Sequence, residues 1–486
     1  MSDSTATPSP TLTDAQKAAH LSARYRRIVV PYMPGIANMI PTAHKFEWRG
    51  APYLALPHTE DYTKVVQNFG FAVPAPILHY YDWNGGTPFE VQKQSAAMLT
   101  VERRGYVLNG MGTGKTRTVL WAFDWLKREG LANRMLVVAP LSTLHMTWAR
   151  EAFATLPGRK VCVLHGPRAK RLAMLAEPAD IYVVNHDGMD IIANEVTNRD
   201  DIDVIVLDEL AVYRTYSTRR WKTMNRVVAR KPRVWGLTGS PTPNEPADAW
   251  AQVKLVTPST MPTGLIAFRE SVMLKVSNFR WVPKPGAMER VRQVMQPAVR
   301  YTLDDVIELP EVVMRTVDVP LGDKQKAVYD QLQNKLCAQF AAGDVTAQNA
   351  GILMNKLLQV SIGYVYTDMR GIVTLDNEAR LDALVDAIEA TDHKVICFVP
   401  FLHGLRSPMR SFQVKFPSAS ATTYSAPSRR HLSRRSSWPI RNACRMGSRS
   451  LPRTPSSGLA RLPLWKCSSR RMLASPVWGR STGSRC

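Results

Sequence analysis

The segment GYVLNGMGTGKTRTVL at 105–120 constrains the fold of this chain more than any other. An apolar run of strand length leads into a turn that holds three glycines, and a stretch with helical spacing of apolar residues follows directly. Glycine permits the left-handed backbone and the close approaches that such a turn requires. A strand that passes through a tight turn into a helix begins a strand–helix–strand unit, so this segment indicates an α/β fold with parallel strands.

Five more apolar runs follow along the chain, rich in Val, Ile and Leu. They lie at 135–140, 160–165, 180–186, 203–209 and 234–240. Nearly unbroken runs of this kind suit parallel strands that are buried on both faces of a sheet. Amphipathic stretches between them predict a doubly wound α/β domain over 86–255. Helical spacing at 377–390 and an apolar run at 394–401 predict the opening of a second α/β unit.

The glycine-rich turn has the residue types that bind a polyphosphate. Its glycines let main-chain N–H groups approach phosphate oxygens at the start of a helix. They are Gly110, Gly112 and Gly114. Lys115 can neutralise the β- and γ-phosphates, and Thr116 can bind Mg²⁺ through its hydroxyl. The strict G-x-x-x-x-G-K-[ST] pattern has glycine where this chain has Asn109. An ordinary glycine-rich turn is the alternative, but the flanking strand and helix favour a nucleotide site.

Two further groups of polar residues lie at predicted strand ends. Asp208 suits Mg²⁺ coordination, and Glu209 suits the base that orients an attacking water. Two acids after an apolar run also occur by chance, which is the alternative here. Thr238 and Ser240 carry small hydroxyls that can bond this acidic pair or a nucleic acid. A plain turn of Gly and Pro is the alternative for that second group.

Taken in order, these segments resemble the motifs of a superfamily 2 helicase of the Swi/Snf type, one of the DEAD/DEAH-like helicase ATPases. The matching stretches are MGTGKT, VVAPLSTLHMTWAREAF, DELA and LTGSPTPN, and Trp250 follows the last of them. The resemblance covers 86–402. It implies RecA-like doubly wound sheets of the P-loop NTPase class, with one complete lobe and the start of a second. Ala211 stands where DEAH proteins have their final His.

The resemblance also assigns roles to individual residues of an ATP-dependent DNA translocase that uses ATP and Mg²⁺. The catalytic residues are Lys115, Asp208 and Glu209, and the metal is held by Thr116 and Asp208. The ATP-binding residues are Gln92, at the position that contacts adenine, with Gly110, Met111, Gly112, Thr113, Gly114, Lys115 and Thr116. The nucleic-acid path runs along Pro140, Ser142 and Thr143. Coupling between the sites involves Thr238, Gly239 and Ser240.

The expected organisation has six parts. They are a disordered segment at 1–20, a small accessory domain at 21–85, RecA-like lobe one at 86–255, a connection at 256–320, the start of lobe two at 321–402 and a basic tail at 403–486. The accessory segment faintly resembles the HepA-related domain of annealing helicases, and a small packing domain is the alternative.

The last part of the chain departs from the rest in composition. The formal net charge is +23, but residues 403–486 hold 17 Lys and Arg with no Asp or Glu. The other 402 residues carry 46 basic and 40 acidic side chains, a net of +6. One interpretation is a basic arm that binds nucleic-acid phosphates. The favoured interpretation is out-of-frame translation, because the family resemblance stops abruptly inside lobe two.

This break shapes the functional expectation. The family continues with motifs V and VI, and the Q-x-x-G-R-x-x-R pattern of motif VI does not occur after 402. We therefore expect a truncated or frameshifted translocase that binds ATP but hydrolyses it poorly, with uncovered apolar faces at 377–390 and 394–401. The first alternative is an ATP-responsive nucleic-acid clamp without productive turnover. A P-loop kinase is a further alternative, disfavoured because it would need a lid in place of the later motifs.

Partners and compartment follow from the same residues. Double-stranded or forked DNA is favoured over RNA, and the oligomeric state stays open. The polar N-terminus lacks the apolar stretch of a signal peptide, and no apolar run reaches membrane-spanning length. We therefore expect no membrane partner and no secretion. The compartment would be the cytoplasm in a bacterial or viral setting, or the nucleus in a eukaryote.

Overall fold

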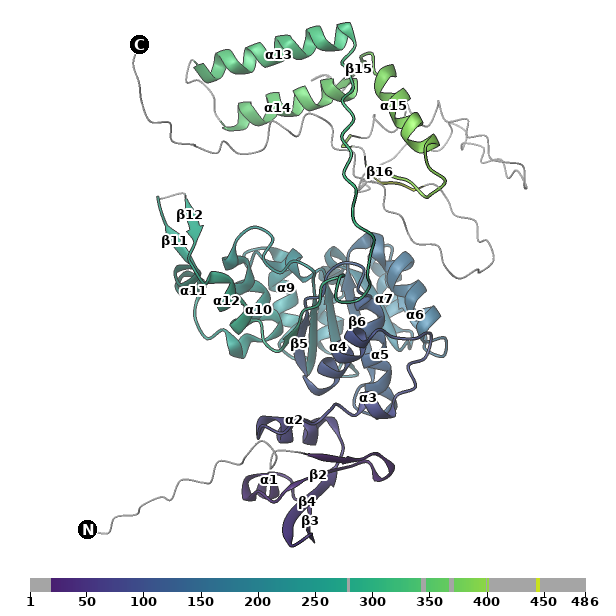
Figure 1. Cartoon of the computed structure of the whole chain (residues 1–486), viewed down its shortest axis with the longest axis vertical. Coiled ribbons are helices and arrows are strands. Elements are labelled where there is room, and N and C mark those ends of the chain that lie inside the picture. The colour runs from purple at the N-terminus through teal and green to yellow at the C-terminus, as the bar shows by residue number, and fades with distance from the viewer. Residues whose placement is uncertain are drawn as a thin grey trace, which may run out of the picture. The chain divides into compact units, whose positions relative to one another are not determined.

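The computed structural model describes residues 19–277, 280–341, 347–366, 371–398, 400–401 and 443–445 (Figure 1). Residues 1–18 of the segment 1–20 that was expected to be disordered, and most of the basic tail at 403–486, fall outside these ranges. The chain forms two compact units, Met1–Leu309 and Pro310–Cys486.

The first unit opens with a four-stranded antiparallel sheet in the order β1-β2-β4-β3 (Figure 1). Its strands are β1 (His20–Ser22), β2 (Arg27–Pro31), β3 (His44–Trp48) and β4 (Ala51–Pro57). The helices α1 (Pro34–Met39) and α2 (Glu60–Asn68) accompany it. Alternate residues of β2 and β4, such as Ile28 and Leu54, face a small core that α1 and α2 close. The segment 21–85 therefore contains its own apolar core.

Contacts from α2 attach this small sheet to the following domain. Trp125 donates its indole N–H to the carboxylate of Glu60, which is buried. Lys64 pairs with Glu102, and Asp61 accepts from Arg103 at 3.4 Å. This hydrogen bond gives both the Trp125 N–H and the buried Glu60 carboxylate a partner, so neither polar group is left unsatisfied at the junction.

The central element is a seven-stranded, all-parallel sheet in the order β13-β5-β10-β9-β6-β8-β7. The strands are β5 (Arg104–Val107), β6 (Arg134–Ala139), β7 (Val161–Val163), β8 (Ile181–Asn185), β9 (Ile202–Asp208), β10 (Arg233–Leu237) and β13 (Ala298–Val299). Every one of the six apolar runs predicted as strands forms one. The fold is therefore the doubly wound α/β class that the sequence predicts.

Helices cover both faces of this sheet, because the strands bury side chains on each side. In β9, Val204 and Val206 face one core while Ile205 and Leu207 face the other. The first face is covered by α4 (Glu90–Val101), α5 (Lys115–Arg128) and α6 (Arg150–Thr155). The second is covered by α7 (Arg168–Ala176), α8 (Met189–Thr197), α9 (Arg219–Val228), α10 (Ala249–Val256), α11 (Leu265–Val272) and α12 (Ala287–Val294).

The segment after residue 255 contributes more to this unit than a connection would. α11 and α12 add to the second core, a hairpin joins β11 (Met273–Lys275) to β12 (Trp281–Pro283), and β13 pairs with β5. No strand was expected at 298–299, because two residues are too few to show any periodicity.

The second unit contains helices and short strands, and all but the last of them lie within 321–402, the segment predicted to start lobe two; the last lies in the basic tail, where no element was predicted. They are α13 (Asp323–Ala341), α14 (Ala347–Ile362), β14 (Tyr364–Tyr366), β15 (Ile372–Thr374), α15 (Glu378–Glu389), β16 (Ile396–Phe398) and β17 (Ala443–Arg445). The apolar run at 394–401 forms β16, and its large apolar side chains are not buried. Ile396 and Phe398 are 66% and 61% exposed, and β16 pairs antiparallel with β17. This matches the expectation that apolar side chains stay uncovered here.

Candidate functional site

Three strand ends place the predicted site residues at one edge of the sheet. β5, β10 and β9 are neighbours, and all three run parallel. Their carboxyl ends lead into the glycine-rich loop 108–114, the segment Thr238–Ser240 and the pair Asp208–Glu209. Neighbouring strands lie about 4.8 Å apart, so the loop and the acidic pair are separated by about 10 Å across β10. This edge is where open α/β sheets bind ligands.

The glycine-rich loop turns tightly into α5 through two left-handed residues. Gly112 has φ +85° and Gly114 has φ +79°. Gly114 is the residue before the first turn of α5, and a methyl group added to it would lie 2.1 Å from Gln92 Nε2. Glycine is therefore required at 114 both by the backbone angle and by the space. Met111, at the tip, is 86% exposed.

The buried side chain of Gln92 supports the glycine-rich loop by a hydrogen bond to its main chain. Its side chain is buried, donates to Thr113 O at 3.0 Å and accepts from Phe89 N at 3.0 Å. The amide groups of Gln92 therefore bond to the protein main chain. The expected contact with adenine would require one of these bonds to exchange.

Lys115 points back into the loop. Its Nζ donates to the main-chain oxygens of Asn109 and Gly110, both at 2.9 Å. Burial lowers the pKa of Lys115, while the charges of Asp208 and Glu209 act in the opposite direction. The ammonium group is thus half-buried against main-chain acceptors, which suits it to hold an incoming phosphate. Thr116 lies half-buried in the first turn of α5.

Asp208 is a half-buried carboxylate at the end of β9. Trp148 Nε1 donates to its Oδ2 at 2.8 Å, and Glu209 N donates to its Oδ1 at 3.0 Å. Burial raises the pKa of Asp208, whereas these two donors and Lys115 lower it. Glu209 is exposed and has a left-handed φ of +54°, which is uncommon for a residue with a Cβ. The backbone strain accordingly lies at Glu209, the predicted catalytic base.

The segment Thr238–Ser240 lies between the loop and the acidic pair. Thr238 is buried, its N donates to Val107 O at 3.2 Å, and its hydroxyl accepts from Ser240 N at 3.2 Å. A methyl group on Gly239 would lie 3.5 Å from Asn109 O. Among the described residues, no hydrogen bond joins Thr238 or Ser240 to the acidic pair. The segment Thr238–Ser240 therefore lies closer to the glycine-rich loop, the proposed phosphate loop, than to Asp208 and Glu209.

The predicted nucleic-acid residues follow β6 at the same edge. Thr143 donates from its main-chain N and its hydroxyl to Pro140 O, at 3.0 and 2.9 Å. These bonds close a short turn in which Ser142 is exposed. Ser142 is thus available to a ligand at the surface, whereas the Thr143 hydroxyl is used within the turn.

Two site residues were missed by sequence reasoning. Trp148 bonds Asp208 from η4 (Leu144–Ala149), and its only sequence signal was its place in the resemblance segment VVAPLSTLHMTWAREAF. Asn109 was noted only as a departure from the strict glycine pattern. In the structure it is buried and bonds to two other elements through its side chain.

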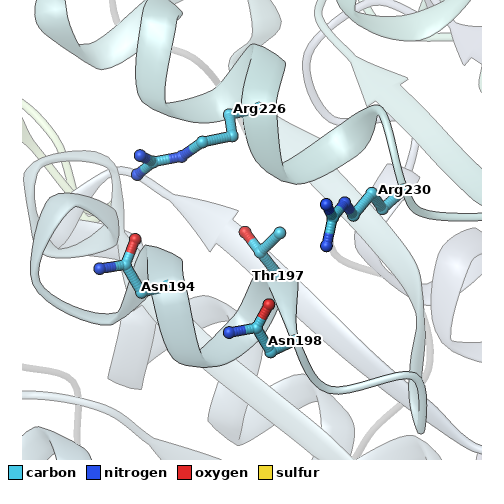
Figure 2. Close-up of a pocket in the computed structure, with 5 residues that line it drawn as sticks. All are labelled: Asn194, Thr197, Asn198, Arg226 and Arg230. Carbon is cyan, nitrogen blue, oxygen red and sulfur yellow. The ribbon is translucent and has the colours of Figure 1, made fainter.

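A surface hollow of about 220 Å³ lies away from this edge, between the ends of α8 and α9. Figure 2 shows its lining: Asn194, Thr197, Asn198, Arg226 and Arg230. Asn198 and Arg230 lie a few residues before β9 and β10 begin, so the hollow is at the opposite edge of the sheet. It is separate from the candidate site.

Fold and site together define a RecA-like α/β protein of the P-loop class. A family model described as the SNF2-related domain matches residues 86–362, which is more than half of the chain. The chain belongs to the SNF2-related domain family. The predicted Swi/Snf-type membership is therefore confirmed, and with it the relationship to ATP-dependent remodelling and translocating enzymes.

Relatives differ widely in how much of their length the chain matches. Protein p41 of Acyrthosiphon pisum secondary endosymbiont phage 1 is 25% identical over 328 residues, covering 64% of this chain and 71% of that protein. The chromatin-remodeling ATPase INO80 of Drosophila melanogaster is 25% identical over 279 residues, 52% of this chain and 17% of that protein. The chain thus spans less than a fifth of the INO80 sequence that it matches.

Solved structures of the same family were also found. A Sulfolobus solfataricus SWI2/SNF2 ATPase core in complex with dsDNA is 18% identical, with a TM-score of 0.40, covering 63% of this chain and 65% of that chain. The ATPase core domain of the same organism is 19% identical, with a TM-score of 0.39 and coverages of 67% and 68%. Within the described residues, no helix has the length and apolar character to cross a membrane.

Proposed function

We propose that this chain binds ATP at residues 110–116 and acts as a DNA translocase. One observation carries the proposal: the left-handed Gly112 and Gly114 lead into α5, while the half-buried Lys115 places its Nζ at the main-chain oxygens of this loop. Main-chain N–H groups at a helix start and one ammonium group form the standard cradle for a nucleotide's phosphates. The membership of the SNF2-related domain family supports ATP as the nucleotide.

The residues at this edge also fit Mg²⁺. Thr116 would bind the ion through its hydroxyl and Asp208 through its carboxylate, which are the oxygen donors that Mg²⁺ prefers beside phosphate oxygens. When bound, the ion neutralises charge on the phosphates. Glu209, exposed and next to Asp208, would orient the attacking water.

We propose DNA as the polymer that the chain contacts, along Pro140, Ser142 and Thr143. The exposed Ser142 follows β6 at the same sheet edge as the nucleotide loop. Hydroxyl and main-chain groups of this kind contact phosphates without reading bases, as a translocase requires. The similarity to INO80, a chromatin-remodeling ATPase, supports DNA over RNA.

We further propose that turnover by this 486-residue chain is slow. The pattern Q-x-x-G-R-x-x-R does not occur after residue 402. An arginine that reaches the transferred phosphate from a second element is worth roughly 10³–10⁵ in rate. This observation favours the second candidate function, an ATP-responsive clamp that binds DNA without productive turnover.

Phosphate release with and without double-stranded DNA distinguishes the two functions. A slow rate that DNA raises severalfold, and that Glu209→Gln abolishes, identifies an impaired translocase. Binding of ATP and DNA without any DNA-dependent rate identifies the clamp. Vigorous DNA-stimulated hydrolysis would contradict the proposed impairment, and failure to bind nucleotide would contradict both functions.

A further inference from the structure

Asn109 forms hydrogen bonds with three parts of the first unit: α4, the start of α5 and the segment after β13. Its side chain is 1% exposed. Oδ1 accepts from Tyr301 N at 3.0 Å, and Nδ2 donates to Ser95 Oγ in α4 at 3.1 Å. Because a main-chain N–H can only donate, the oxygen of the carboxamide must face Tyr301. The main-chain oxygen of Asn109 accepts from Lys115 Nζ at 2.9 Å.

The segment 299–303 runs along the phosphate loop as a continuation of β13. Leu108 N donates to Val299 O and Gly110 N donates to Tyr301 O, both at 2.8 Å. The main-chain N–H of Tyr301 therefore donates to the Asn109 side chain, and its main-chain oxygen accepts from Gly110 N. A methyl group on Gly112 would lie 3.4 Å from Leu303 Cδ1, so the side chain of Leu303 is next to the glycine turn.

Segment 299–303 is also the part of the chain that leaves this domain. Thr302 donates from its N and its hydroxyl to Asp305 Oδ2, at 2.6 and 2.8 Å, which closes a turn directly after Tyr301. The compact unit ends at Leu309, and the second unit begins at Pro310. The loop that would receive phosphates is thus hydrogen-bonded to the chain that continues into the second unit.

We propose that Asn109 is a positioning residue that ties the phosphate loop to segment 299–303, so that nucleotide binding is transmitted to the chain leaving the domain. The inference rests on the proposed nucleotide site. A phosphate that takes the ammonium group of Lys115 removes a donor from the oxygens of Asn109 and Gly110. Those residues hold Tyr301, so the change in the loop reaches segment 299–303 directly.

The strict glycine of the phosphate-loop pattern could not perform this role, because it has no side chain. A carboxamide at 109 can accept from Tyr301 and donate to Ser95 at once. Both partners are within the protein and buried or half-buried, so each bond is protected from competition by water. The replacement of glycine by Asn109 therefore has a defined physical consequence.

Hydrogen exchange of the peptide that spans 299–306 tests the proposal, with and without Mg²⁺-ATP. In the unmodified chain, ATP is expected to slow exchange of the Tyr301 amide severalfold. Asn109→Leu removes both side-chain bonds with little change in volume. It should still bind ATP, exchange about three- to tenfold faster at Tyr301, and show no response to ATP there.

Two variants separate this role from general support of the fold. Asn109→Asp keeps an oxygen that can accept from Tyr301 N but loses the donor to Ser95, so it should restore the response of 299–306. Ser95→Ala removes only the partner in α4 and should leave the response intact. An unmodified chain that binds ATP with unchanged exchange at 299–306, or an Asn109→Leu variant that keeps the response, would overturn the proposal. No nucleotide binding by the unmodified chain would instead refute the proposed function.

Discussion

Replacement of Gly114 by alanine should damage the phosphate loop by two separable effects. The backbone at 114 has φ +79°, where a residue with a Cβ costs about 1–2 kcal/mol. The added methyl group would also meet Gln92 Nε2 at 2.1 Å, so the side chain of Gln92 must leave. Its bond to Thr113 O is then lost, which costs about 1 kcal/mol. We expect Gly114→Ala to lower the free energy of unfolding by about 2–3 kcal/mol.

Gly130 provides the matched control. It has φ +73° and no atom within 4 Å of an added methyl group. Gly130→Ala should therefore show only the backbone cost of about 1–2 kcal/mol. Urea unfolding of the two variants measures the difference, and titration with a fluorescent ATP analogue should show weaker binding for Gly114→Ala alone.

A double-mutant cycle with Gln92 isolates the steric effect. In the background of Gln92→Ala, the methyl group at 114 has no side chain to displace, so its cost should fall to that of Gly130→Ala. Equal costs for Gly114→Ala in both backgrounds, or a cost no larger than that of Gly130→Ala, would refute the packing of Gln92 beneath the loop.

Three further predictions concern buried polar groups. Burial lowers the pKa of His186 to about 4. Between pH 6.5 and 4 the unfolded state therefore binds more protons than the folded state. The free energy of unfolding should fall by about 3 kcal/mol as the pH drops through that window. His186→Gln should flatten this dependence in thermal unfolding; an unchanged slope would assign it to other groups. Trp148→Phe leaves one oxygen of Asp208 without its donor and should cost about 1–3 kcal/mol in urea unfolding, with no loss contradicting the bond. The carboxylate of Asp124, with 2% exposure, pairs with two arginines, and Asp124→Ala leaves both without it; the free energy of unfolding should fall by about 3–5 kcal/mol. Arg103→Ala, which breaks an exposed ion pair, should lower it by less than about 1 kcal/mol. Similar losses for the two variants would contradict the argument from burial.

The sheet was predictable because its strands are buried on both faces. Unbroken apolar stretches such as 204–207, within the run 203–209, suit few structures other than a central parallel strand. β13 was not predictable, since Ala298 and Val299 are a strand only through their bonds to β5. The apolar run at 394–401 forms a strand, β16, but composition alone does not tell whether that strand is buried. Its composition suits a buried strand, yet burial depends on neighbouring elements that composition does not encode.

The candidate site was predictable where chemistry demands particular residue types. Glycines, Lys115 and the pair Asp208–Glu209 follow from what a polyphosphate and its metal require. The supporting residues did not follow, because any donor of suitable length can fill such a role. Trp148 reaches Asp208 across 60 positions of sequence, and Asn109 reaches Tyr301 across 192. Contacts of this kind depend on the packing of the whole unit.

The nucleotide site is best tested by binding of a fluorescent ATP analogue to the 486-residue chain, with Mg²⁺ present. We expect saturable binding that unlabelled ATP displaces. We also expect Lys115→Ala, which removes the half-buried ammonium group, to weaken binding at least tenfold while the fold is retained. Absence of saturable binding in the unmodified chain, or equal binding by Lys115→Ala, would contradict a nucleotide site at residues 110–116.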